Sequence, residues 1–225
     1  ATVTMLTDGD AVASVLEGAS LAERTLIQMS TIAPAASQQL AEQVTAAGGE
    51  YLEAPVLGSI PEAEEGRLLV MVGARAPAFD RWHEVLTTFG PAPRHVGRIG
   101  QAATLKLALN QLIASQTAAF AYSLGLVQRG GLLTETFMEV LRESPLYAAQ
   151  FDKKLPRLLD GNFADPNFPL RHLRKDVDLC LQAGGVLGLG REALLGVQAV
   201  IDRAVGLGLG DGDYAGLHDA VNPRD

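Results

Sequence analysis

The sequence predicts an α/β domain over residues 1–97 and an all-α domain over residues 98–225. Short apolar and β-branched runs alternate with helical runs up to about residue 97, which is typical of a layered α/β sheet. After Gly97 the strand pattern stops, and a long apolar helical run is followed by shorter ones. A chain of 225 residues, of which 48 % are hydrophobic, is long enough to form both domains.

The first domain is predicted from four strand-like runs and three helical runs. The strands are expected at Val3–Leu6, Leu26–Met29, Tyr51–Leu52 and Leu68–Val72. The helices are expected at Ala11–Leu16, Ser37–Ala47 and Ala76–Phe89. Ser37 is a favourable N-cap residue for the second helix, and Gly48 and Gly49 are expected to end it.

The second domain is predicted to be built on one long interdomain helix, Gln101–Gln128. This run has no glycine or proline before Gly125 and is apolar around most of its circumference, so we expect it to be buried. Shorter helices are expected at Thr134–Arg142, Ala148–Leu155, Phe168–Ala183 and Arg191–Val205. The alternating glycines from Gly206 to Gly212 predict a loop.

Charge and composition argue against several classes of protein. The net charge is −8, whereas a general nucleic-acid-binding protein needs a basic face for the phosphates. No apolar run approaches the ~18 residues of a membrane-spanning helix, so no membrane partner is expected, and the N-terminus has no signal-peptide pattern. The single cysteine, Cys180, allows no intrachain disulfide and fits a reducing compartment, so a cytoplasmic protein is expected.

Lys106 and Asn110 form a polar pair on the long helix. They are four residues apart, so they project from the same face of a helix that is otherwise apolar. An ammonium and a carboxamide placed together there can hold a substrate oxygen and supply a proton to it. Spacing alone favours a different explanation, in which Lys106 extends to the surface near the helix start.

Two loops that follow predicted strands carry groups suited to ligands. Gly58 and Ser59 can present backbone N–H groups to a carboxylate, although a simple turn is the favoured explanation of this loop taken alone. Thr31 lies where open α/β sheets bind ligands, beyond the carboxyl end of a strand. A Ser/Thr turn at the start of a helix explains Thr31 equally well.

The helical run that opens with Phe168 carries Lys175 and Asp176. Lys175 lies roughly 150° around the helix from the middle of the apolar stripe. A solvated charged face is the favoured explanation, and the alternative is that this face lines a cleft between the domains.

The run from Gly188 to Ala193 matches the loose form of the dinucleotide fingerprint. That fingerprint binds a pyrophosphate only between a strand and a helix. Here a helical run precedes it, so we interpret it as a loop between two helices.

Five motifs, in this order, resemble the β-hydroxyacid dehydrogenase family. They are Thr4–Asp8, Met29–Pro34, Glu53–Ser59 with Gly66, Gly97–Gly100 through Lys106 and Asn110, and Phe168–Leu170 through Lys175 and Asp176. The resemblance covers essentially the whole chain and is strongest to the glyoxylate/succinic semialdehyde reductase branch. It implies that the first domain is the C-terminal part of a nicotinamide-dinucleotide-binding, Rossmann-like domain, and that the second is a substrate and dimerisation domain.

The resemblance also implies a role for each candidate site residue. Lys106 matches the catalytic lysine. The implied substrate-binding residues are Gly58, Ser59, Asn110, Phe168 and Asp176. The implied cofactor-binding residues are Met5, Leu6, Thr31 and Lys175, and no metal is implied.

The chain departs from the family pattern in two places. The family usually has serine where this chain has Leu57, so one possible donor to a substrate carboxylate is lost. Family members also begin with a strand, a glycine-rich turn and a helix that hold the pyrophosphate, and roughly sixty such residues are expected before Ala1. The given chain by itself is therefore expected to bind a dinucleotide weakly or not at all, so that it can be inactive without the preceding segment.

The predicted function is NAD(P)H-dependent reduction of a small aldehyde or keto acid, of the glyoxylate or succinic semialdehyde type, to the hydroxy acid. The hydride would come from the nicotinamide and the proton from Lys106, with NADP favoured over NAD by the branch resemblance. A homodimer or homotetramer is expected. The alternatives are a truncated, non-catalytic dimerisation module and a dehydrogenase of the 3-hydroxyisobutyrate or tartronate semialdehyde type. An imine reductase of the same fold is disfavoured by the lysine at position 106.

Overall fold

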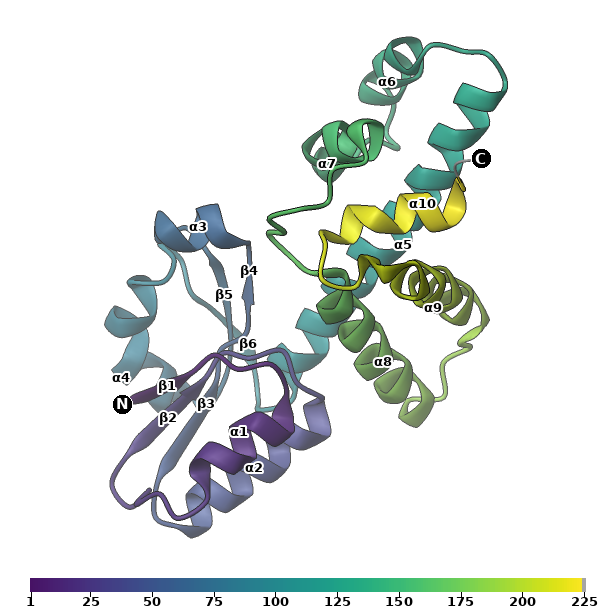
Figure 1. Cartoon of the computed structure of the whole chain (residues 1–225). Coiled ribbons are helices and arrows are strands. Elements are labelled where there is room, and N and C mark those ends of the chain that lie inside the picture. Colours follow the sequence, from purple (N-terminus) through teal and green to yellow (C-terminus); the bar gives the residue numbers. More distant parts are fainter. Residues whose placement is uncertain (224–225) are drawn as a thin grey trace. The chain divides into compact units, whose positions relative to one another are not determined.

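The computed structural model describes residues 1–223 and separates the chain into two compact units (Figure 1). The α/β unit comprises Ala1–Leu109 with Gln182–Leu189. The helical unit comprises Asn110–Leu181 and the chain from Gly190 onward. The predicted order, α/β first and all-α second, is confirmed. The division between the units falls inside the long helix, after Leu109.

The α/β unit is built on a six-stranded mixed sheet in the order β1-β2-β3-β5-β4, with β6 paired to β5. Its strands are β1 (Thr2–Thr4), β2 (Thr25–Gln28), β3 (Glu50–Glu53), β4 (Val56–Leu57), β5 (Leu69–Gly73) and β6 (Arg94–Gly97). Strands β1, β2 and β3 are parallel, β5 is antiparallel to both β3 and β4, and β6 is parallel to β5. Within the described residues, β1 is therefore an edge strand.

Four helices accompany this sheet: α1 (Gly9–Leu16), α2 (Pro34–Ala46), α3 (Ile60–Glu64) and α4 (Ala76–Thr87). Adjacent residues of β2 enter different cores because side chains alternate along a strand. Leu26 packs in a cluster with residues of α1 and α2, whereas Ile27 packs in a cluster with residues of α4. Helices thus cover both faces of the sheet, as is usual for parallel strands buried on both sides.

The predicted elements of this unit exist, but several details differ. Ser37 is not an N-cap: the helix begins at Pro34, a residue pre-organised for the first helical position, and Ala33 is the N-cap. Ser37 lies in the first turn and is buried. Strands β4 and β6 and helix α3 were not predicted; β4 has only two residues and β6 begins with two exposed ones, so neither has a clear apolar pattern.

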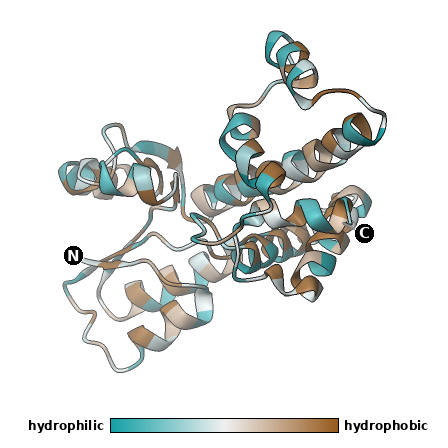
Figure 2. Cartoon of the chain, turned by 45° about the horizontal axis from the view of Figure 1, so that its top comes forward, coloured by the Kyte–Doolittle hydropathy of each residue, from teal (hydrophilic) through white to brown (hydrophobic). Residues whose placement is uncertain are grey.

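The helical unit is organised around α5 (Gln101–Arg129), which begins in the α/β unit. The other helices are α6 (Thr134–Glu143), α7 (Ala149–Asp160), α8 (Leu170–Val186), α9 (Glu192–Ala204) and α10 (Leu217–Val221). Ala114 and Ala121 of α5 pack in a core with α8, α9 and α10, whereas Phe120 and Leu124 pack with α6 and α7. Figure 2 shows hydrophobic and hydrophilic residues interspersed along these helices, as expected for helices that bury one face.

Four predictions for the helical unit are wrong in detail. Helix α5 is not buried all round, because Leu112, Tyr122 and Leu126 are exposed. Helix α8 begins at Leu170, so Phe168 precedes it, and α7 continues through Pro156 because Leu158 is a core residue. The glycine-rich run is only partly a loop: residues Val205–Leu209 form a π-helical turn, and a 3-10 turn (Tyr214–Gly216) and α10 follow.

Candidate active site

The loops after β1 and β2 are held together at the carboxyl ends of these two parallel strands. The backbone N–H of Leu6 donates to Ser30 Oγ at 2.7 Å, and the backbone N–H of Met29 donates to the carbonyl of Thr4 at 2.8 Å. Gln28 fixes the second loop further, since its Oε1 accepts from the backbone N–H of Ser30. The structure thus places the predicted cofactor residues Met5, Leu6 and Thr31 in two adjoining loops, at the sheet edge where α/β folds bind ligands.

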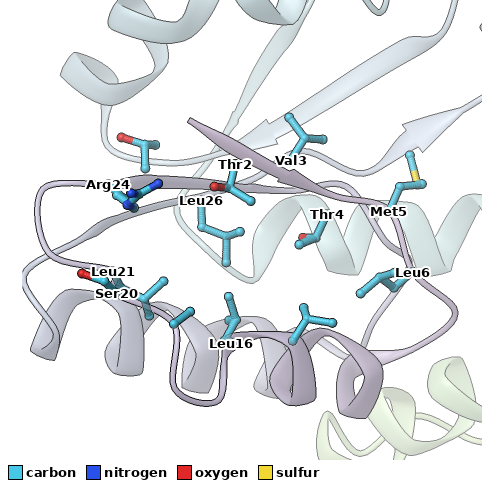
Figure 3. A pocket seen from close by; sticks show the side chains of 13 residues that line it. Thr2, Val3, Thr4, Met5, Leu6, Leu16, Ser20, Leu21, Arg24 and Leu26 are labelled. Atoms are coloured by element: carbon cyan, nitrogen blue, oxygen red, sulfur yellow. The ribbon is translucent and has the colours of Figure 1, made fainter.

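A cavity of about 600 Å³ lies beside β1 (Figure 3). Residues of β1, of α1 and of the segment before β2 line it, and most of them are apolar. Met5 and Leu6 contribute to this lining, but Thr31 does not. The exposed side chains of Val3 and Met5 border the edge of β1 that has no paired strand within residues 1–223, so this cavity is an apolar groove along a strand edge.

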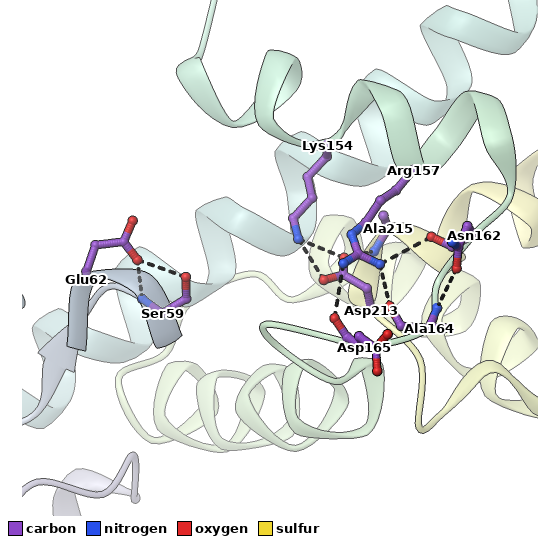
Figure 4. Close-up of polar contacts among 9 residues, drawn as sticks. All are labelled: Ser59, Glu62, Lys154, Arg157, Asn162, Ala164, Asp165, Asp213 and Ala215. Carbon is purple, nitrogen blue, oxygen red and sulfur yellow. Dashed lines mark hydrogen bonds and ion pairs between the residues drawn. The ribbon is translucent and has the colours of Figure 1, made fainter. Parts of the chain in front are cut away.

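Gly58 and Ser59 form the predicted carboxylate-binding loop, and the structure gives Ser59 a partner within the chain. The backbone N–H and the hydroxyl of Ser59 both donate to Glu62 Oε2, at 2.7 and 2.8 Å, in a capping box at the start of α3 (Figure 4). Gly58 has a φ of +136°, and a Cβ there would lie 2.7 Å from Leu68. Position 58 therefore requires glycine, and both donors of Ser59 are already bound to the Glu62 carboxylate.

Lys106 and Asn110 lie one turn apart on α5, and both are buried, with 8 % and 2 % of their surface exposed. The surface position that spacing alone favoured for Lys106 is therefore wrong. Asn110 Nδ2 donates to Asp176 Oδ2 at 2.6 Å. Among the described residues, the buried Oδ1 of Asn110 has no hydrogen-bond partner, so it is an acceptor that a ligand can satisfy.

Asp176 connects two of the predicted residues within the helical unit. Only 3 % of it is exposed, and its Oδ1 lies 3.0 Å from Lys175 Nζ while its Oδ2 binds Asn110. The favoured expectation of a solvated charged face is wrong for Asp176, which points inward, while Lys175 keeps 25 % of its side chain exposed. Phe168 packs against the core of this unit, with its ring centroid 5.8 Å from that of Tyr214.

A buried acid and a buried ion pair were missed by the sequence analysis. Glu53, at the end of β3, is fully buried and accepts hydrogen bonds from the start of α5. Lys154 and Asp213 form a buried ion pair in the helical unit (Figure 4). Glu53 is the first residue of the family motif Glu53–Ser59, but no role was predicted for it. An acidic residue at the end of an apolar strand was the signal that could have identified it as a candidate. The pairing of Lys154 with Asp213, 59 residues apart, has no such local signal.

Between residues 1 and 223 there is no group of three or more His, Cys, Asp or Glu side chains that could hold a metal ion. No helix in that range is long and apolar enough to cross a membrane. The glycine run Gly188–Gly190 lies between α8 and α9, so the interpretation as a helix-to-helix loop is confirmed.

Comparisons with known proteins relate both halves of the chain to one family. Residues 1–100 match the model of the NAD-binding domain of 6-phosphogluconate dehydrogenase. Residues 100–220 match the model of the NAD-binding domain of NADP-dependent 3-hydroxyisobutyrate dehydrogenase. Glyoxylate/succinic semialdehyde reductase 1 of Arabidopsis thaliana is 29 % identical, and the match covers 98 % of this chain and 78 % of that protein. The chloroplastic reductase 2 of the same plant is 27 % identical, over 87 % of this chain and 54 % of the relative.

Solved structures show the same fold. The 3-hydroxyisobutyrate dehydrogenase of Mycobacterium tuberculosis, solved with L-serine, has a TM-score of 0.88 at 21 % identity, covering 97 % of this chain and 78 % of that one. An imine reductase of Myxococcus stipitatus in complex with NAD⁺ has a lower TM-score of 0.61 at 20 % identity, with 97 % and 78 % covered. The family predicted from the five motifs is confirmed: the chain belongs to the β-hydroxyacid dehydrogenase family, whose members are NAD(P)-dependent oxidoreductases.

Proposed function

We propose that this protein catalyses the NAD(P)H-dependent reduction of a small aldehyde or keto acid to the hydroxy acid, with Lys106 as the proton donor. The observation that carries the proposal is the buried polar pair on α5: a lysine ammonium and, one turn later, a carboxamide with an unsatisfied oxygen. A buried amide oxygen without a hydrogen-bond partner among the described residues is unfavourable, so Asn110 Oδ1, one turn from the buried Lys106, favours a role of this pair in binding and chemistry.

The proposed reaction balances with one hydride and one proton. When bound, the reduced nicotinamide supplies the hydride to the carbonyl carbon of the substrate. The Lys106 ammonium donates its proton to the carbonyl oxygen as that oxygen gains negative charge, and solvent later returns a proton to the amine. The positive charge of Lys106 also stabilises the developing alkoxide before the proton moves.

Asn110 orients the reacting oxygen in this proposal. Its Nδ2 is held by Asp176, which leaves Oδ1 as the group that faces a ligand and accepts the hydrogen bond of the product hydroxyl. Asp176 is buried behind Asn110, so we assign it the positioning of that side chain rather than contact with the substrate. Phe168 keeps its proposed place near the substrate.

The substrate carboxylate is assigned to the loop of Gly58 and Ser59, where the Glu62 carboxylate competes for the same hydrogen-bond donors. Glu62 already accepts from both donors of Ser59, so a substrate carboxylate must either replace that side chain or use the backbone N–H of Gly58. Replacing Glu62 with glutamine removes a like charge while keeping an acceptor for the cap. We therefore expect Glu62→Gln to lower the KM of a carboxylate-bearing aldehyde and to leave the KM of an uncharged aldehyde unchanged.

The described residues fit part of a nicotinamide dinucleotide. Met5, Leu6 and Thr31 lie at the carboxyl ends of β1 and β2, and Lys175 is assigned to the nicotinamide end of the cofactor. NADP is favoured over NAD by the resemblance to the semialdehyde reductase branch and by the match of residues 100–220 to the model of an NADP-dependent dehydrogenase. A cytoplasmic location stays a prediction, which cell fractionation can test.

The test combines binding with turnover. The full-length protein is titrated with NADPH and NADH by calorimetry, and its reduction of glyoxylate, succinic semialdehyde, tartronate semialdehyde and the aldehyde of 3-hydroxyisobutyrate is followed by nicotinamide absorbance. We expect turnover of at least one of the first two aldehydes, with NADPH preferred. Binding of neither cofactor and reduction of no aldehyde would favour a non-catalytic dimerisation module, and a preference for either of the last two would favour the other dehydrogenases.

We also propose that the helical unit mediates homo-oligomerisation. Leu112, Tyr122 and Leu126 of α5 and Leu133 and Val140 of the following segment are exposed apolar side chains. Large apolar side chains exposed on one helix and on the segment that follows it favour an interface in which a second copy of the chain buries them. Sedimentation of the wild-type chain should show a dimer or tetramer, and a monomer at micromolar concentration would contradict this assignment.

A further inference from the structure

Glu53 is a fully buried carboxylate that connects β3, α2 and α5 within the α/β unit. Its Oε1 accepts from the backbone N–H of Ala102 at 2.8 Å and of Ala103 at 3.4 Å, the second and third residues of α5. Its Oε2 accepts from Ser37 Oγ at 2.6 Å. One oxygen is thus bound to the start of the long helix and the other to α2.

The surroundings of Glu53 are built to accept a carboxylate. The Ser37 hydroxyl donates its proton to Glu53. The Tyr51 hydroxyl lies 2.8 Å from Ser37 Oγ, and because the Ser37 proton is already used, Tyr51 donates to Ser37. The first N–H groups of a helix lack partners within the helix and carry partial positive charge, which a carboxylate satisfies. Gly73 on the neighbouring strand leaves the necessary room, because a Cβ there would lie 2.2 Å from Glu53 Oε1.

Lys106 projects from the turn of α5 that follows the one held by Glu53. Lys106 follows Ala102 by four residues, so the two residues lie on the same face of α5 in successive turns. Chemistry at a lysine depends on its position, since a displacement of about 1 Å at a reacting group can cost about 100-fold in rate.

We propose that Glu53 is a positioning residue for Lys106: by anchoring the first turn of α5 to β3 and α2, it sets the place of the ammonium that donates the proton. The proposal rests on the proposed function of Lys106. Burial raises the pKa of the Glu53 carboxyl, and the hydrogen bonds from Ser37, Ala102 and Ala103 act in the opposite direction by stabilising the carboxylate.

The experiment compares Glu53→Ala, Glu53→Gln and Ser37→Ala with the wild-type chain by two readouts. Hydrogen exchange of the Ala102 and Ala103 amides reports on the anchor without any substrate. Aldehyde reduction reports kcat and KM, with kcat normalised to the folded fraction. Glu65→Gln, an exposed acid paired with Arg67, is the control for loss of a carboxylate.

We expect Glu53→Ala to speed exchange of both amides and to lower kcat by about 10- to 100-fold with little change in KM, because the lysine is displaced while substrate contacts remain. Glu53→Gln should restore most of kcat, since the amide oxygen still accepts from the helix, and Ser37→Ala should show a weaker loss. If Glu53→Ala does not fold, the Gln and Ser37 variants decide the question.

Faster amide exchange in the folded Glu53→Ala or Ser37→Ala variants, with kcat unchanged, would overturn the positioning role while leaving the proposed function intact. Equal loss of kcat in Glu53→Gln and Glu53→Ala, with exchange as in the wild type, would also overturn it. A full-length wild-type protein that reduces no aldehyde would instead contradict the proposed function, and with it the role of Glu53 in catalysis.

Discussion

The buried ion pair between Lys154 and Asp213 allows a quantitative test of what holds the helical unit together. Lys154 Nζ lies 2.8 and 2.7 Å from the two carboxylate oxygens of Asp213, and the two side chains are 5 % and 0 % exposed. The ammonium also lies 4.3 Å from the centroid of the Tyr214 ring. The pair links α7 to the segment before the last helices, and Asp213 Oδ1 additionally accepts from the backbone N–H of Ala215.

Removing one partner leaves the other charge buried without compensation, which destabilises a protein by about 3–5 kcal/mol. Lys154→Met keeps the apolar stem but leaves the Asp213 carboxylate in this state. For a chain of this size, each kcal/mol lowers Tm by about 2–4 °C, so the expected decrease is roughly 6–20 °C. The double variant Lys154→Met/Asp213→Asn removes both charges and keeps an acceptor for Ala215, so its free energy of unfolding should lie within about 1–2 kcal/mol of the wild type.

The assay is urea unfolding followed by two probes. Helix content by circular dichroism reports mainly on the helical unit, and fluorescence of the single tryptophan, Trp82, reports on the α/β unit. Lys154→Met should shift the helix transition strongly and the Trp82 transition less. A shift of the helix transition by less than about 1 kcal/mol in Lys154→Met would refute the reasoning, as would a double variant no more stable than the single one.

Three other predictions follow from the same structure. Gly73→Ala should lower the free energy of unfolding by about 1–3 kcal/mol, because its Cβ would overlap Glu53 Oε1; an unchanged urea midpoint would contradict this. Burial raises the pKa of Glu53 above its ordinary 4.5, so the folded state holds that proton more tightly than the unfolded one. As the pH rises from about 4.5 to neutral, the wild type should therefore lose stability relative to Glu53→Gln. A Tm difference between these two proteins that does not change with pH would contradict this prediction. Tyr122→Lys combined with Leu126→Lys should shift the chain toward monomer in sedimentation without lowering Tm, because both side chains are exposed; an unchanged oligomer would exclude this face.

The order of elements was predictable because it depends on local patterns. Period-2 and helical repeats of apolar residues are visible in short windows, and they placed β2, β5 and α5 within a residue or two of their observed positions. The short strand β4 and the edge strand β6 escaped because neither presents enough apolar residues for a pattern. Both depend on pairing with β5.

In the candidate site, too, local sequence predicted the residues but not their long-range contacts. Lys106 and Asn110 were found from their spacing and from the family motifs, but their burial depends on packing that no short window reveals. The bond between Asn110 and Asp176 joins residues 66 positions apart. Ser37 was assigned to a helix start by its local propensity, whereas its hydroxyl serves Glu53, a contact across 16 residues. Long-range contacts of this kind are set by the fold and not by the neighbouring sequence.

Turnover of a Lys106 variant tests the central claim most directly. The measurement is kcat for NADPH-dependent reduction of the preferred aldehyde by Lys106→Ala, beside the wild type and Lys153→Ala, an exposed lysine on α7. If Lys106 donates the proton, kcat of Lys106→Ala should fall by about 10²- to 10⁴-fold while the affinity for NADPH and the activity of Lys153→Ala stay close to the wild-type values. A Lys106→Ala variant that turns over within a few-fold of the wild type would contradict the account.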